Sequence, residues 1–312
     1  MARPLRIEYP GAFYHVTSRG NEKKDIFRDT KDRQRFLRYL ESATERYGAS
    51  MHVYCLMSNH YHLLLETPKG NLSQIMRHIN GAYTTYFNVR HQRAGHLFQG
   101  RYKAILVEFD EYAKELSRYI HLNPVRAGIV ENPGKYPWSS YQYYVGHKKA
   151  PEWLVAGFIL SYFSKKVSSA RKTYREFVQI FIGPEYESPL QNVVASTILG
   201  SSDFVQKIKE RYIDTEKVDR NLPALRELST GITIERVNIE VESVFGNDAK
   251  LSRKVSLYVC HRYSGLKLKE IGNHFGIGES GVSEASRRVA LRIGTDRRLR
   301  KKIQTIKNIL EL

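Results

Sequence analysis

The stretch from Met57 to Glu66 constrains this chain most, since it reads Met-Ser-Asn-His-Tyr-His-Leu-Leu-Leu-Glu. A short apolar run with Ser-Asn before it and Thr-Pro-Lys-Gly after it is typical of a buried β-strand. Because side chains alternate between the faces of a strand, His60 and His62 share one face and Tyr61 points to the other. Two adjacent imidazoles can bind one metal ion, although such pairs are more often only hydrogen-bonded packing residues. The pair therefore predicts a metal site only if other residues complete it.

The charge of the chain indicates a polyanionic partner. Its 312 residues include 50 Lys and Arg against 32 Asp and Glu, a formal net charge of +18, and 21 Tyr. Cations attract phosphates and unstacked bases stack on flat rings, so this mixture suits nucleic acid. Many of the tyrosines will instead be half-buried core residues. The length allows two domains.

The two cysteines indicate a reducing compartment. Cys55 and Cys260 lie far apart and in no metal-binding spacing, which argues against a disulfide framework. Arg3, Arg6 and Glu8 interrupt any signal-peptide core, and no apolar run reaches membrane-spanning length. We therefore expect a soluble cytoplasmic protein without a membrane partner.

The first 150 residues alternate between strand and helix patterns. Besides the histidine stretch, strands are predicted at residues 12–19, 51–56 and 104–108. Helices are predicted from about Thr30 to Tyr47, from Leu72 to Phe87 after an Asn71 cap, and from Asp110 to about Asn123, where Pro124 ends the last one. This order predicts an α+β fold, a ferredoxin-like (RRM-like) antiparallel sheet with helices on one face. The other face would stay open for the two histidines.

The remaining chain divides by composition. We expect a first domain over residues 1–150, ending in the turn-rich aromatic segment that begins at Tyr136, and a helical connecting region over 151–246. Residues 247–312 carry 15 Lys and Arg against 6 Asp and Glu. They hold a short helix around Leu268–Phe275, a Gly-Ile-Gly turn and a second helix from about Ser280. This pattern predicts an all-α region with a helix-turn-helix, whose second helix would present Ser283, Arg287 and Arg288 to a DNA major groove. An ordinary helical hairpin with a solvated charged face is the alternative.

The third predicted helix contains a possible partner for the histidines. Tyr119 and Asn123 lie one turn apart, at the edge of a stripe formed by Ala113, Leu116 and Ile120. Residues four apart on a helix are neighbours, so a phenol and an amide oxygen could meet the same ion or phosphate. From spacing alone, a core-edge tyrosine and a C-terminal helix Asn before proline are the more common explanation.

Five motifs in this order resemble the single-strand "HUH" tyrosine transposases, and in particular their REP-associated branch. In chain order they are Arg19-Gly20-Asn21, His60-Tyr61-His62, Phe98-Gln99-Gly100-Arg101-Tyr102, the run Arg118–Gly128 and Tyr136-Pro137-Trp138-Ser139-Ser140. The resemblance covers residues 1–150 densely. Residues 250–290 separately resemble the DNA-binding domain of the DnaA replication initiator, a Trp-repressor-like helix-turn-helix, with Leu268–Gly276 as the matching core.

The resemblance implies a DNA transposase that nicks and rejoins single-stranded or hairpin DNA through a phosphotyrosine. It implies that Tyr119 is the nucleophile and that His60, His62 and Asn123 hold a divalent ion, Mg²⁺ or Mn²⁺. Two residues depart from the family pattern. Tyr61 stands where an aliphatic residue is usual, and Asn123 stands where the wider class carries Gln, so the third ligand has a shorter reach.

We further predict which residues contact DNA. In the first domain these are Arg19, Asn21, Arg101, Lys103 and Arg126, for a single-stranded or hairpin repeat. Duplex DNA would bind the C-terminal domain. A free phenol titrates near pH ~10, so the nucleophile needs activation, yet no base stands out, since His121 lies on another face of its helix.

Two other functions remain open from the sequence. One is a DNA-binding regulator that keeps the fold but has lost cleavage. The other is a hydrolytic zinc enzyme that uses the two histidines with His52 or Cys55, although neither has convincing ligand spacing. The resemblance is compatible with either a monomer or a homodimer.

Overall fold

The computed structural model describes residues 6–109, 111–183, 188–194, 196–213, 232–246, 248–264, 266 and 268–310. Asp110, the expected cap of the third helix, lies outside these residues. The chain forms two compact units, one over Arg6–Lys207 and one that contains Ile208–Leu312. None of the helices in the described part combines the length and the apolar character that a membrane crossing requires.

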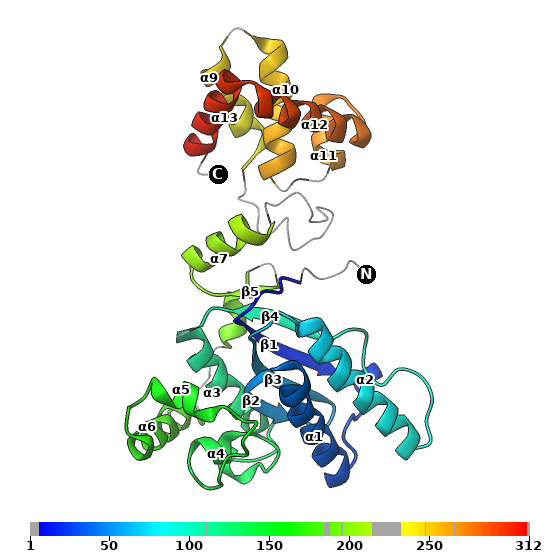
Figure 1. Cartoon of the computed structure of the whole chain (residues 1–312), viewed down its shortest axis with the longest axis vertical. Helices are drawn as coiled ribbons and strands as arrows, with labels where there is room; N and C mark the ends of the chain where they lie inside the picture. Colours follow the sequence, from blue (N-terminus) through cyan, green and yellow to red (C-terminus); the bar gives the residue numbers. More distant parts are fainter. Residues whose placement is uncertain are drawn as a thin grey trace. The chain divides into compact units, whose positions relative to one another are not determined.

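A mixed sheet forms the centre of the first unit (Figure 1). Its strand order is β2-β3-β1-β4-β5, with β1 at Ala12–Arg19, β2 at Ser50–Leu56, β3 at His60–Thr67, β4 at Lys103–Val107 and β5 at Ile198–Leu199. The four predicted strands are confirmed, and β1 pairs antiparallel with both β3 and β4. The short β5 was not predicted. It comes from the region read as connecting helices and pairs with β4 in parallel.

Two helices cover one face of the sheet, as the ferredoxin-like fold predicts. They are α1 (Thr30–Tyr47) and α2 (Leu72–Arg90). Phe36 of α1 packs 4.8 Å from the ring of Tyr61 and 5.0 Å from that of Tyr83 in α2. The hydroxyl of Tyr61, unusual between two histidines, donates to Asn80 Oδ1 over 2.7 Å. Truncating a fully buried ring such as Phe36 typically costs about 3–5 kcal/mol, so this layer fixes β3 firmly.

The opposite face, expected to be open, is instead covered along much of its length. Helix α3 (Glu111–Arg126) packs its predicted stripe of Ala113, Leu116 and Ile120 against Phe13 and Leu64 of the sheet. Helices α5 (Ala156–Ser161) and α6 (Val167–Gln179) add to the same core, and a single turn, α4, spans Tyr141–Tyr144. An apolar stripe on α3 must be buried, and the apolar residues on this side of the strands offer the matching surface.

Helix α3 also passes Pro124, which we had expected to end it. The helix ends at Arg126, and Ala127 N still bonds to Asn123 O at 3.0 Å. A proline in the last turn removes one backbone donor without interrupting the turns before it.

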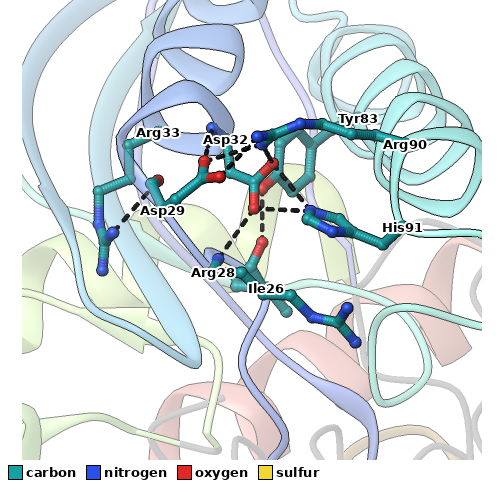
Figure 2. A network of polar contacts seen from close by, with 8 residues as sticks. All are labelled: Ile26, Arg28, Asp29, Asp32, Arg33, Tyr83, Arg90 and His91. Carbon is teal, nitrogen blue, oxygen red and sulfur yellow. Dashed lines mark hydrogen bonds and ion pairs between the residues drawn. The ribbon is translucent and has the colours of Figure 1, made fainter.

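A polar network fixes the loop beside the start of β3 (Figure 2). The buried carboxylate of Asp32 accepts from Arg28 N at 2.9 Å and lies 2.9 Å from His91 Nε2, and Arg90 pairs with it. Asp29 caps α1 and binds Arg90 as well. The same loop donates from Ile26 N to Ser58 O at 2.9 Å. The network thus supports the turn that leads directly into His60.

The second unit is helical. It contains α9 (Ile234–Phe245), α10 (Ala249–Tyr263), α11 (Leu268–Phe275), α12 (Glu279–Thr295) and α13 (Arg297–Ile309). Helix α7 (Ser202–Ile208) precedes it. The two predicted helices and the turn between them are confirmed in α11 and α12. A Cβ on Gly272 would lie 2.5 Å from Ile277 O, so the turn folds back onto α11 at a position where only glycine fits.

Candidate functional site

The strand register gathers the candidate residues on one face of the sheet. Arg19 pairs with His60, Thr17 pairs with His62, and Thr17 also pairs with Lys103. Cross-strand partners in an antiparallel sheet lie on the same face. The two histidines therefore share one face, as the alternation in β3 predicted, and the register adds Arg19 and Lys103 to the same face.

A third histidine joins the pair. His15 is 1% exposed, and its ring lies parallel to that of His62, with the ring centres 5.2 Å apart and the planes 6° apart. Its Nε2 lies 2.9 Å from His62 Nδ1, while the ring of His60 stands 5.1 Å from that of His62. His15 was not among the predicted site residues. His15 lies four residues before Arg19 on the same strand, so both side chains point to one face. This spacing is the signal in the sequence that would have indicated His15.

Tyr119 of α3 is the tyrosine that meets these rings in the described part of the chain. Its ring stands 6.0 Å from His62 and 6.3 Å from His15, nearly perpendicular to both. The guanidinium of Arg126, two turns later on α3, lies 4.9 Å from the centre of the Tyr119 ring. The other nearby tyrosines have different surroundings: Tyr112 packs on the core and the Tyr83 hydroxyl donates to Ile26 O.

Asn123 is fixed by the helix itself. Its Nδ2 donates to the carbonyl oxygen of Tyr119 at 2.9 Å. This bond orients the side chain and leaves its Oδ1 as the atom that can accept from, or coordinate, another group.

The electrostatic surroundings keep the imidazoles neutral and favour an anion. Burial, and secondarily Arg19, lowers the pKa of His60 to about 4. The pKa of His62 lies well below its ordinary value, first because of burial and then because of His15, His60, Arg19 and Arg126. Neutral imidazoles have a lone pair to offer a metal ion, and the exposed Arg19 and Arg126 attract phosphate.

Two loops bring the predicted DNA contacts to this place. Gly20 N donates to Asn59 O, Asn21 N to Leu97 O and Gln99 N to Arg19 O, each at 2.8 Å. The turn with Arg19 and Asn21 is thereby joined to the loop that precedes Arg101 and to the start of β3. Arg101 and Lys103 are both exposed.

His121 anchors α3 from its far side. It is fully buried, with Nδ1 2.7 Å from the Tyr174 hydroxyl and Nε2 2.8 Å from Ser140 Oγ. Burial lowers its pKa to about 3. It lies on another face of the helix from Tyr119, as predicted, and bonds the helix to α6.

His52 and Cys55, considered as further zinc ligands, contact other residues. His52 stacks on Phe13 and its Nε2 is 3.8 Å from Glu66 Oε2. Cys55 pairs with His62 across the sheet, but its thiol donates to Met57 Sδ. Across the described ranges, no three His, Cys, Asp or Glu side chains are arranged to hold a metal ion.

The second unit carries its own candidate residues on α12. Ser283, Arg287 and Arg288 are exposed. Both guanidinium groups pair with Glu284, at 3.1 and 3.0 Å, and Ser283 Oγ donates to Glu279 O.

Comparisons with known proteins identify the first part of the chain. Residues 9–123 match the family described as transposase, IS200 like. One similar solved structure is that of a REP-associated tyrosine transposase bound to a REP hairpin. It has 17% sequence identity and a TM-score of 0.41, over 48% of this chain and 89% of that one. Among curated proteins none matches significantly. The N-terminal part of this chain therefore contains an IS200-like transposase domain.

Proposed function

We propose that the first unit cleaves and rejoins single-stranded or hairpin DNA through a covalent bond to Tyr119. The proposal rests on one observation, the contact of the Tyr119 ring with the histidine cluster between Arg19 and Arg126. A nucleophile, two neutral imidazoles and two cations then surround a position that suits a phosphodiester. The IS200-like match over residues 9–123 supports the same chemistry.

The reaction exchanges one phosphate ester for another. The Tyr119 oxygen attacks the phosphorus and loses its proton, while the bond from phosphorus to a strand oxygen breaks and frees a hydroxyl end. The phosphotyrosine conserves the ester bond, so a hydroxyl end can later attack it and rejoin DNA. Arg126 lies against the Tyr119 ring, where its charge favours the developing phenolate and the phosphate oxygens.

The residues fit a divalent ion, Mg²⁺ or Mn²⁺. His60 Nδ1 lies 2.7 Å from Asn59 Oδ1, an acceptor, which places the His60 proton on Nδ1 and its lone pair on Nε2. Asn59 itself is oriented by donating Nδ2 to Lys23 O. We propose His60, His62 and Asn123 Oδ1 as the ligands. Such an ion would neutralise charge on the phosphoryl oxygens.

We also propose the DNA contacts. Arg19, Asn21, Arg101, Lys103 and Arg126 would hold the cleaved strand. Ser283, Arg287 and Arg288 would bind duplex DNA through the second unit. The division into a cleaving domain (1–150), a helical connection (151–246) and a duplex-binding domain (247–312) stays a prediction.

A labelled single-stranded repeat incubated with the protein and Mn²⁺ tests the function. We expect a covalent adduct that mass spectrometry locates on Tyr119. Tyr119→Phe should abolish it without changing DNA affinity, and the matched variant Tyr112→Phe should retain it. DNA binding without any adduct would instead identify a cleavage-inactive regulator, and an adduct on Tyr112, Tyr83 or Tyr86 would refute the site assignment.

A further inference from the structure

His15 and His62 form a buried pair that shares one hydrogen. Their exposed fractions are 1% and 7%, and only 2.9 Å separates His15 Nε2 from His62 Nδ1. Each neutral imidazole carries one N–H and one lone pair. Over this distance one of the two nitrogens must donate and the other accept.

The direction of this bond decides whether His62 can bind a metal ion. If His62 Nδ1–H donates to His15, the lone pair of His62 is on Nε2, the nitrogen left for an ion. If His15 Nε2–H donates instead, His62 carries its hydrogen on Nε2 and that nitrogen cannot coordinate. A metal-binding histidine is normally oriented by an acceptor at its second nitrogen.

The second ring nitrogen of His15, Nδ1, favours neither direction of the bond between His15 and His62. His15 Nδ1 is buried and has no hydrogen-bond partner in the described part of the chain. When His62 donates, His15 Nδ1 is an unpaired donor, and when His15 donates, His15 Nδ1 is an unpaired acceptor. Nδ1 therefore stabilises neither direction over the other. An ion on His62 Nε2 would then select the direction in which His62 donates.

The first ligand histidine has an equivalent support. Asn59 Oδ1 accepts from His60 Nδ1 at 2.7 Å, and its amide is held in that orientation by the bond from Nδ2 to Lys23 O at 3.0 Å. The two histidines of β3 thus each meet a group at Nδ1, an amide for His60 and an imidazole for His62.

We propose that His15 is a positioning residue of the metal site, which accepts the Nδ1 hydrogen of His62 and so keeps the lone pair of His62 on Nε2. This inference rests on the proposed function of His62 as a ligand. The two ring planes differ by only 6°, as an N–H···N bond in the plane of both rings requires, and this gives His15 a second effect, since it fixes the plane in which the lone pair of His62 points. Losing such a supporting group typically weakens metal binding by roughly 10- to 100-fold.

Mn²⁺ affinity of the full chain without DNA tests the proposal, measured by electron paramagnetic resonance. His15→Phe keeps an aromatic ring at this position and removes the acceptor, and His15→Gln restores an acceptor in its amide oxygen. We expect His15→Phe to bind Mn²⁺ roughly 10- to 100-fold more weakly and His15→Gln to recover most of the loss. A structural role alone would not predict rescue by Gln.

Two outcomes separate this inference from the proposed function. If His62→Ala loses Mn²⁺ binding while His15→Phe binds like the wild type, His15 has no positioning role although the metal site stands. If His62→Ala also binds Mn²⁺ normally, the metal site itself is refuted and the inference falls with it.

A measurement on the wild-type chain covers the case in which His15→Phe does not fold. Nitrogen-15 NMR of the histidines in excess Mg²⁺ reports which ring nitrogen carries hydrogen. We expect the hydrogen of His62 on Nδ1, and a hydrogen on Nε2 in the Mg²⁺-loaded protein would overturn the proposal.

Discussion

The hydroxyl of Tyr174 lies 2.7 Å from Nδ1 of His121. This bond joins α6 to α3 inside the core, and the same hydroxyl donates to Ser117 Oγ at 3.0 Å. Arg118 reinforces the contact by donating from Nη1 to Phe177 O. The IS200-like match ends at residue 123, so the helix that carries Tyr119 is held by a segment beyond that match.

Tyr174→Phe should loosen the helix that carries the nucleophile. The change leaves His121 Nδ1 buried without a partner, which lowers the free energy of unfolding by about 1–3 kcal/mol. A nucleophile displaced by 1 Å can lose up to about 100-fold in rate, so adduct formation should slow while DNA affinity stays constant. Urea unfolding and single-turnover kinetics check this. Tyr162→Phe, a partly exposed tyrosine of the same segment (39% exposed), is the control, and equal rates in both variants would contradict the idea.

Removing the ion should stop cleavage and leave folding intact. His60→Ala removes one proposed ligand, and because His60 is only half-buried the fold should tolerate the change. We expect no covalent DNA adduct from this variant, and none from the wild type in the presence of a chelator. Adding excess Mn²⁺ should restore adduct formation by the wild type but not by His60→Ala. His78→Ala, on α2, serves as the matched histidine control. Full activity in the chelator would show that the chemistry needs no divalent ion.

Alkaline pH should unfold the protein cooperatively. Burial raises the pKa of Tyr136, Tyr141 and Tyr258 to about 12, against about 10 in an unfolded chain. A folded-state pKa above the unfolded one means that the stabilisation is complete below pH ~10 and is lost as the pH rises toward ~12. Each such tyrosine lowers the unfolding free energy by about 1.4 kcal/mol per pH unit in that window.

Tyrosinate absorbance and circular dichroism recorded together test this expectation. The three buried tyrosines should ionise only as the helices are lost. Ionisation of these buried tyrosines with the fold intact would contradict the prediction.

Substitutions on α12 should either weaken or strengthen the binding of duplex DNA, depending on the charge that is removed. Arg287→Ala and Arg288→Ala should each weaken duplex binding and reduce its salt dependence by about one counterion. Glu284→Gln should strengthen binding, because Glu284 now pairs with both guanidinium groups. Affinities at several salt concentrations provide the measurement. Unchanged binding in all three variants would refute the duplex-binding function of this helix.

Local patterns determined most of the elements and the main candidates. Alternation in β3 placed His60 and His62 on one face, and helical spacing placed Tyr119 and Asn123 one turn apart. These relations follow from backbone geometry within one element, so neighbouring residues suffice to predict them. The glycine turn between α11 and α12 was equally local.

Only the tertiary structure decided which residues and elements contact one another across the sequence. His15 and His62 are 47 residues apart and His121 and Tyr174 are 53 apart, and no period in the sequence specifies such pairs. The same holds for β5, which joins the sheet from a region without a strand pattern, and for α3, which covers the face expected to be open. An apolar stripe on a helix predicts that this surface is buried, but it does not predict which element covers it. That choice depends on the packing of all the elements together.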